Sequence, residues 1–182
     1  MSRSPTTTKE AIIEGALQLV RKQGYEALTV RNLASFLGCS TQPVMYHFPS
    51  MAALKEQTYE RADILHSKYI LAAEDLLEIG IRYILFAKEE PQLFRFLFQS
   101  GHFSGLSLED LIRAPEAAGV LAAVSAEEAL TPEDAASFFE PLAALVHGYA
   151  SLIANNAMNY DPDAIRSTLL TIAEGLERNQ KS

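Results

Sequence analysis

The chain has 182 residues, 48% of them hydrophobic, so it can bury a substantial core and is not a disordered protein. Its single cysteine, Cys39, excludes an intrachain disulfide and a zinc site built on paired cysteines. The N-terminus lacks a secretory signal pattern, and no apolar run reaches the roughly 18–20 residues that span a bilayer. We therefore expect a cytoplasmic protein with no membrane association, no metal and no cofactor.

The net charge of −8 is unevenly distributed along the chain. Residues 1–61 hold seven Lys/Arg against five Asp/Glu, a net of +2, whereas the remainder holds eight against eighteen, a net of −10. Attraction to phosphate depends on the field within a Debye length of about 8–10 Å, so a mildly basic head can bind DNA beside an acidic body. Ordinary charge scatter is the alternative for so small an imbalance.

Every substantial segment predicts a helix, which makes the fold class all-α. Thr7 and Glu10 form a predicted capping box, and an apolar stripe continues until Gly24 ends the first helix. Short helices are expected at about 30–37 and 41–48, and a longer one begins near Met51. We predict a three-helix domain over residues 1–50 and a helical regulatory and dimerisation domain over 51–182.

After the long helix that begins near Met51, the second domain continues with a predicted helix at about 72–89 and a short aromatic helix over 93–98. Residues 100–105 are a loop by composition, Ser107 with Asp110 opens another helix, and the Ala-rich stretch 114–130 gives no clear pattern. Thr131-Pro132 and Asp161-Pro162 each place an N-cap before a proline at the first helical position. These signals predict helices at about 132–157 and 162–179.

Residues 30–48 carry the pattern of a helix-turn-helix. Ala34 is small where two steeply crossing helices approach, and Gly38 supplies the positive φ that reverses the chain. Ser40 is the predicted cap of the second helix, and Val44 points back to the core with Leu33 and Leu37. An ordinary αα-corner without DNA affinity is the alternative.

The 45 or so residues from the first helix through Thr29-Val30-Arg31, Leu33-Ala34, Gly38-Cys39-Ser40-Thr41-Gln42-Pro43 and His47-Phe48 resemble the N-terminal domain of TetR-family regulators. The resemblance implies a DNA-binding transcriptional regulator, whose second short helix reads the major groove and whose His47 meets a phosphate. Two positions depart from the family pattern. Met45 occupies the usual tyrosine position, with Tyr46 one residue later, and Met51 replaces a lysine for which Lys55 can substitute.

Four of the candidate DNA-binding residues, Thr41, Gln42, Met45 and Tyr46, share the side of the second short helix opposite Val44 and Phe48. Gln pairs with adenine, Thr or Met contacts a thymine methyl group, and Tyr or His holds phosphate. Packing between domains is the alternative for the aromatic positions. The set comprises Thr29, Arg31, Thr41, Gln42, Pro43, Met45, Tyr46, His47 and Lys55.

The segment from Tyr83 to Phe98, with His147-Gly148, partly resembles the C-terminal domain of a TetR subgroup named for a Trp-His-Gly signature. The chain has no tryptophan, so only His-Gly fits. Aromatic side chains here could line an apolar effector pocket with a histidine as its polar group, and plain core packing is the alternative for each. The candidates are Tyr83, Phe86, Phe94, Phe98, Phe103 and His147.

The sequence contains no catalytic motif: the four histidines are scattered, and Gly-x-Ser-x-Gly and phosphate-binding glycine loops are absent. We therefore predict a regulator and not an enzyme. It is expected to bind a palindromic operator in double-stranded DNA as a homodimer, with the last two helices forming the dimer interface. A repressor released by a small apolar effector is the expected mode. The alternative function is a helical protein- or ligand-interaction module that does not bind DNA.

Overall fold

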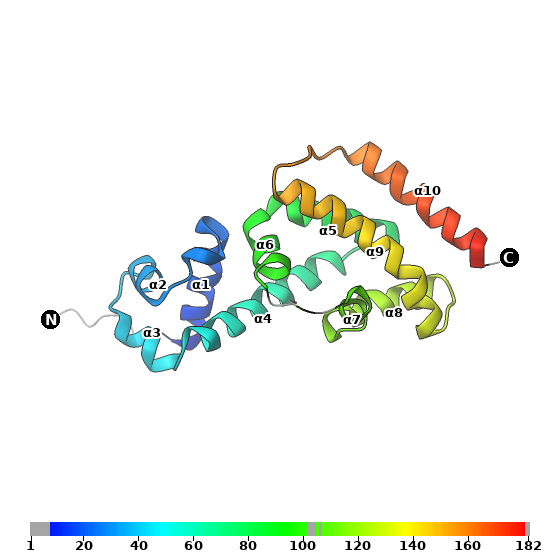
Figure 1. Ribbon diagram of the computed structural model, residues 1–182. Helices are drawn as coiled ribbons and strands as arrows, with labels where there is room; N and C mark the ends of the chain where they lie inside the picture. The colour runs from blue at the N-terminus through cyan, green and yellow to red at the C-terminus, as the bar shows by residue number, and fades with distance from the viewer. Residues whose placement is uncertain (1–7, 102–104, 106, 181–182) are drawn as a thin grey trace. The chain divides into compact units, whose positions relative to one another are not determined.

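The computed structural model describes residues 8–101, 105 and 107–180, and over these residues it contains helices and no strand (Figure 1). The predicted all-α class is thereby confirmed. The described residues form two compact units. The first unit comprises the residues up to Leu65 and those from Gln92 to Gly101; the second comprises His66–Pro91 and those from Gly105 onward. Since these are packing units, the functional boundary predicted at residue 50 stays a prediction.

The first unit begins with α1 (Lys9–Gln23), η1 (Tyr25–Ala27), α2 (Val30–Phe36) and α3 (Thr41–His47). α1 ends at Gly24 as predicted, and φ there is 84°, which favours glycine. The start differs from the prediction, because the hydroxyl of Thr8 accepts a hydrogen bond from the Ala11 N–H at 3.1 Å. Thr8 is therefore the N-cap, and Thr7 lies outside the described residues. Three successive threonines make this position ambiguous in the sequence.

The first part of α4 (Met51–Ile70) and most of α6 (Pro91–Gln99) complete the first unit. α4 begins where predicted, and the Ser50 hydroxyl accepts a hydrogen bond from the Ala53 N–H. On α6, the ring of buried Phe96 lies 6.4 Å from that of Tyr25 and 6.0 Å from that of Tyr59. Phe96 thus joins η1 to α4, although it is distant from both in the sequence.

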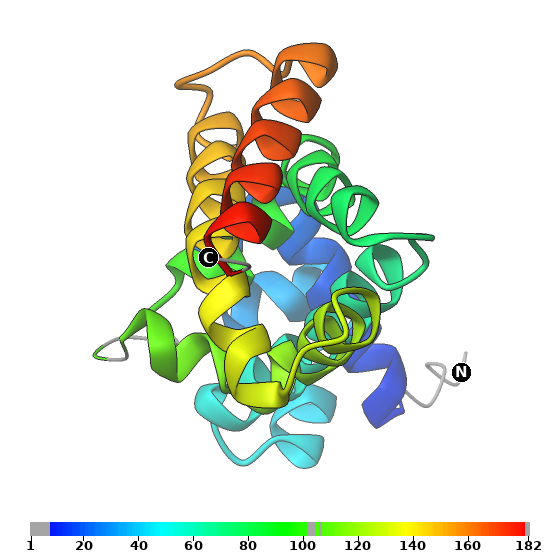
Figure 2. The same ribbon diagram turned by 90° about the vertical axis from the view of Figure 1, so that its right-hand side faces the viewer.

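The second unit contains α5 (Leu76–Glu89), α7 (Leu108–Ile112), η2 (Pro115–Ala117), α8 (Ala118–Glu127), α9 (Pro132–Ala154) and α10 (Pro162–Gln180). α9 packs against α5, α7 and α8, and α10 contacts both α5 and α9 (Figures 1 and 2). A hydrophobic cluster joins the end of α4 to these helices. Its buried members are Ile70, Ile79, Val120, Val124, Ala135 and Phe138.

Polar side chains set the helix starts of the second unit. The Thr131 hydroxyl accepts from the Asp134 N–H, and the Asp161 carboxylate accepts from the Ala164 N–H, as predicted. Two predicted ends are wrong. α5 begins at Leu76 and not at residue 72, because Asp75 caps it. α9 ends at Ala154 and not at 157, and Asn156 just beyond it adopts a positive φ of 55°.

Candidate functional site

The turn between α2 and α3 has the geometry that the sequence predicts. Gly38 adopts a φ of 66°, and the Cys39 N–H donates to the Ala34 carbonyl at 2.9 Å. Leu33 and Val44 are buried on the facing sides of the two helices. Ser40 stands at the cap position, but its side chain makes no capping hydrogen bond, so its predicted capping role is wrong. The motif is held mainly by packing and by the backbone of the turn.

The recognition face is our name for Thr41, Gln42, Met45 and Tyr46, the exposed residues on one side of α3. At 3.6 residues per turn they fall within an arc of roughly 140°. Met45 is 49% exposed and Tyr46 83% exposed, whereas Val44 on the other side is 1% exposed. Because two large side chains are left in water beside two polar ones, this face has the composition of a surface that contacts a ligand.

The remaining candidates for DNA contact flank the recognition face in the chain. Arg31 and Lys55 are exposed on α2 and α4, and Pro43 and His47 of α3 are half-buried. The His47 ring lies edge-on to Tyr46, with centroids 5.1 Å apart. Thr29 already has a structural role, since its hydroxyl accepts from the Asn32 N–H and caps α2. These placements put all nine candidates in the first unit.

Contacts with α1 support the recognition face from behind. The Lys9 ammonium lies 5.7 Å from the centroid of the Phe48 ring, just after α3, and Phe48 is itself buried. A Cβ at Gly15 would lie only 2.5 Å from Leu37, so α1 passes close to the turn because this position has no side chain. The Arg61 and Glu14 side chains approach to 3.7 Å and link α4 to α1.

The candidate effector residues fall in different units. In the second unit, the Tyr83 hydroxyl and His147 Nδ1 are 2.9 Å apart, joining α5 to α9. Burial lowers the pKa of His147, which favours the neutral imidazole, and the tautomer of that ring decides whether Nδ1 accepts from the Tyr83 hydroxyl or donates to it. In the first unit, Phe94 is buried, and its ring lies 4.9 Å from that of Phe98. Phe103 lies outside the described residues.

Two residues that we did not predict, His66 and Tyr69, surround Phe86. Phe86 is buried, and its ring centroid lies 4.9 Å from that of His66 and 5.8 Å from that of Tyr69. His66 also meets Tyr83 edge-on at 5.2 Å, so it connects Phe86 to the Tyr83–His147 pair. Burial lowers the pKa of His66 to about 4. The only sequence signal was a histidine on an apolar helix face, which seldom marks a site.

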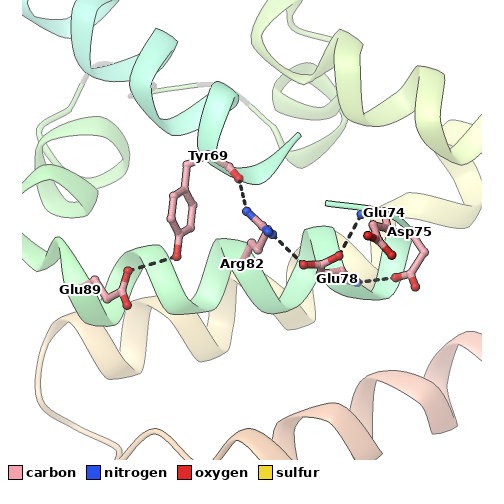
Figure 3. A network of polar contacts seen from close by, with 6 residues as sticks. All are labelled: Tyr69, Glu74, Asp75, Glu78, Arg82 and Glu89. Carbon is pink, nitrogen blue, oxygen red and sulfur yellow. Dashed lines mark hydrogen bonds and ion pairs between the residues drawn. The ribbon is translucent and has the colours of Figure 1, made fainter. Parts of the chain in front are cut away.

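Tyr69 also belongs to a polar network between the end of α4 and α5 (Figure 3). Its hydroxyl donates to Glu89 at 3.1 Å, and its carbonyl accepts from Arg82 at 3.2 Å. Arg82 donates in turn to Glu78 at 2.9 Å. The Glu74 backbone N–H and the Arg82 side chain lower the pKa of Glu78, while burial and the Glu89 hydrogen bond raise that of Tyr69. The network fixes the α4–α5 corner beside His66.

The described residues include no group of three or more His, Cys, Asp or Glu side chains placed to hold a metal ion. None of the helices described is long and apolar enough to cross a membrane.

Comparison with protein families gives two matches. Residues 12–58 match the model of the bacterial regulatory proteins of the tetR family, and residues 76–173 match the tetracyclin repressor-like C-terminal domain. The first match spans the helix-turn-helix, and the second runs from α5 into α10. No curated protein matches the chain.

Solved structures share the fold at low sequence identity. A variant of TetR from Acinetobacter baumannii AYE in complex with minocycline is 21% identical, with a TM-score of 0.64 over 96% of this chain and 99% of the other. TetR from the same strain is 20% identical, with a TM-score of 0.64 over 94% and 97%. A protein from Pseudomonas aeruginosa PAO1 assigned as a transcriptional regulator is 16% identical, with a TM-score of 0.62 over 97% and 93%.

Proposed function

Since the chain belongs to the TetR family of bacterial regulatory proteins, and is thus a DNA-binding transcriptional regulator, we propose that it is a repressor released by a small-molecule effector. The observation that carries the proposal is the recognition face of α3, with Met45 and Tyr46 exposed beside two polar side chains. Release by an effector is the typical mode of the family. Members act by binding DNA and generally not by catalysis, and we infer the same for this chain, acting in the cytoplasm on its operator.

Each candidate residue has a proposed role in binding DNA. The recognition face enters the major groove, where Gln42 contacts a base edge and Thr41 and Met45 contact thymine methyl groups. Arg31, Lys55 and His47 contact phosphate, which fixes the orientation of α3 on the duplex without reading the sequence. Thr29, Pro43 and Tyr46 complete the surface that contacts the sugar-phosphate backbone along the major groove.

Members of the family dimerise, and we propose that α9 and α10 form the interface, as a four-helix bundle with their symmetry mates. Leu152 on α9 and Leu170 on α10 are 48% and 41% exposed in the single chain. The middle of α9, residues 142–149, is apolar but mostly half-buried. A second copy would cover these side chains and would place two recognition faces on a palindromic operator.

We propose that an apolar effector binds near Tyr83 and His147 in the second unit. The minocycline complex of the Acinetobacter protein supports a small-molecule site in a chain of this fold. Here a hydrogen-bonded pair lies within an otherwise aromatic cluster, so it offers a polar handle to an apolar ligand. Phe86 and Phe94 are buried, and their participation, with that of Phe98 and Phe103, stays a prediction.

The proposed route from effector to DNA runs along α4. This helix is continuous from Met51 to Ile70 and contributes residues to both units, with His66 beside Tyr83. A ligand that displaces Tyr83 would shift His66 and with it the helix that follows the recognition helix. A coupling of about 1–3 kcal/mol would weaken operator binding roughly 5- to 150-fold.

The proposal is tested in two steps with the full chain. Bound duplexes are first selected from a random-sequence pool, and the complex of the protein with the selected operator is then titrated with apolar aromatic compounds. We expect a palindromic sequence, with binding that weakens steeply as salt increases. A compound that releases DNA must bind more weakly to the DNA complex by the same factor. Selection of no sequence would overturn the proposal, and so would release without this reciprocity.

A further inference from the structure

The recognition face carries no full charge. The α3 sequence, Thr41 to His47, contains neither Lys nor Arg and neither Asp nor Glu. We propose that the base pairs read by α3 are A·T pairs, recognised through adenine and the thymine methyl group. This inference rests on the proposed use of α3 in the major groove, and it names the class of operator that the groove contacts favour.

The exclusion of G·C pairs follows from the chemistry of the base edges. Guanine presents two acceptors, which Arg or Lys meets best, and cytosine presents an amino donor, which Asp or Glu meets best. α3 has none of these four residue types. The nearby exposed cations, Arg31 and Lys55, stand on α2 and α4, one helix before and one helix after the recognition helix. Neither base of a G·C pair therefore finds its preferred partner on α3.

The groups that α3 does expose match an A·T pair. The Gln42 amide has both a donor and an acceptor, which complement N7 and the N6 amino group of adenine. Met45 is 49% exposed, and its thioether chain is the largest aliphatic group on the face. Contact with thymine methyl groups would remove this apolar surface from water, whereas cytosine has no such methyl group.

The side chains proposed to contact the bases stand on a helix that is anchored in the core, so the preference for A·T over G·C pairs should be strong. Val44 is buried on the side of α3 away from the recognition face, and Phe48, just after the helix, is also buried, with the Lys9 ammonium 5.7 Å from its ring centroid. Because a seven-residue helix has only two turns, these anchors fix the position of Gln42 and Met45 together. A small shift of α3 relative to the rest of the first unit would require both anchors to leave the core.

The test uses the full chain and operators selected from a random duplex pool. Base pairs contacted by α3 are identified as those at which Gln42→Ala or Met45→Ala relaxes the selected preference. We expect A·T at these pairs in both half-sites. Replacing each contacted thymine by deoxyuridine removes one methyl group and should weaken binding about 4-fold per group. Replacing an A·T pair by G·5-methylcytosine keeps the methyl group, so any further loss reports the adenine contact.

Matched variants separate base reading from phosphate attraction. Met45→Ala should abolish the sensitivity to deoxyuridine at the thymines that Met45 contacts, whereas Lys55→Ala should weaken all duplexes alike and keep that sensitivity. Gln42→Arg should change the preference at one pair per half-site from A·T to G·C, by about 5- to 150-fold.

Failure of the A·T inference can be distinguished from failure of the proposed DNA-binding role. Selected operators with G·C at the contacted pairs, or full affinity for deoxyuridine duplexes, would overturn the A·T inference and leave the repressor proposal intact. Absence of any selected sequence would overturn the DNA-binding role of α3 itself.

Discussion

Acid should destabilise the second unit through His66. This side chain is 4% exposed and lies against the rings of Tyr83 and Phe86, and burial lowers its pKa to about 4. An unfolded histidine titrates near pH 6.5, so the unfolded chain takes up the proton first. The stabilising contribution is therefore complete above about pH 6.5 and is lost as the pH falls towards 4. The difference of about 2.5 units corresponds to a loss of about 3 kcal/mol by pH 4.

The measurement is the free energy of unfolding in urea between pH 7.5 and pH 4, at one protein concentration because a dimer is expected. His66→Phe keeps an aromatic ring among aromatic neighbours and removes the titrating group, and His66→Leu serves if the larger ring is not tolerated. His47→Gln, on half-buried His47 of α3, is the matched control. We expect His66→Phe to lose about 3 kcal/mol less than the wild-type chain on acidification.

Other groups contribute to the acid response, and the comparison between variants cancels them. The pKa values of Glu78 and Asp110 are lowered by their hydrogen bonds, so these carboxylates stabilise the fold above their unfolded pKa and lose that contribution at lower pH. Burial lowers the pKa of His147 as well. Because all three are present in each variant, parallel curves for the wild type and His66→Phe would refute the role of His66.

Three further outcomes are expected. Leu152→Glu combined with Leu170→Glu should give a folded monomer in analytical ultracentrifugation, whereas Leu169→Glu, at a position 3% exposed, should unfold the chain; a persistent dimer in the first variant would place the interface elsewhere. Phe96→Ala should cost about 3–5 kcal/mol in urea unfolding, and a loss below 1 kcal/mol would contradict its central position in the first unit. Tyr83→Phe should cost about 1 kcal/mol through the lost hydrogen bond and should weaken effector binding; unchanged effector affinity in a calorimetric titration would remove Tyr83 from the effector site.

Local sequence signals predicted the helices of the first unit well. Gly24 and Gly38 have the positive φ that the glycines imply, and Val44 is buried as its spacing from Leu33 requires. The start of α1 was missed by one residue, because neighbouring threonines are equally good caps and only the backbone selects Thr8.

The second unit was harder to predict where its sequence is uniform. α8 lies in an Ala-rich stretch whose apolar residues show no single face, so periodicity could not define it. The start of α5 was recoverable, since Asp75 followed three residues later by Glu78 is a capping signal that precedes the apolar stretch. Hydrophobicity alone extends the helix back to residue 72, whereas the Asp75 cap starts it at Leu76.

In the candidate site, too, residues within one helix were predictable from the sequence, whereas contacts between helices distant in the chain were not. The recognition face follows from helical spacing within α3, and its exposure agrees with that spacing. The cluster around His66 was predicted only in part. Tyr83, Phe86 and His147 were candidates, but no local pattern brings His66 of α4 to Tyr83 of α5, or Tyr83 to His147, which lies 64 residues away on α9. The Trp-His-Gly resemblance pointed to His147 but predicted no shared ligand class, because the chain has no tryptophan.

The position of Phe96 determines when the first unit can be completed during synthesis. Its two ring partners, Tyr25 and Tyr59, are made long before it, and the intervening segment His66–Pro91 belongs to the other unit. A ribosome that has released only α1 to α4 therefore exposes a DNA-binding motif whose aromatic core still lacks one ring. The nascent chain must wait for α6, which ends at Gln99, before this unit reaches its full stability, so DNA-binding competence should arise only once the middle of the chain has emerged.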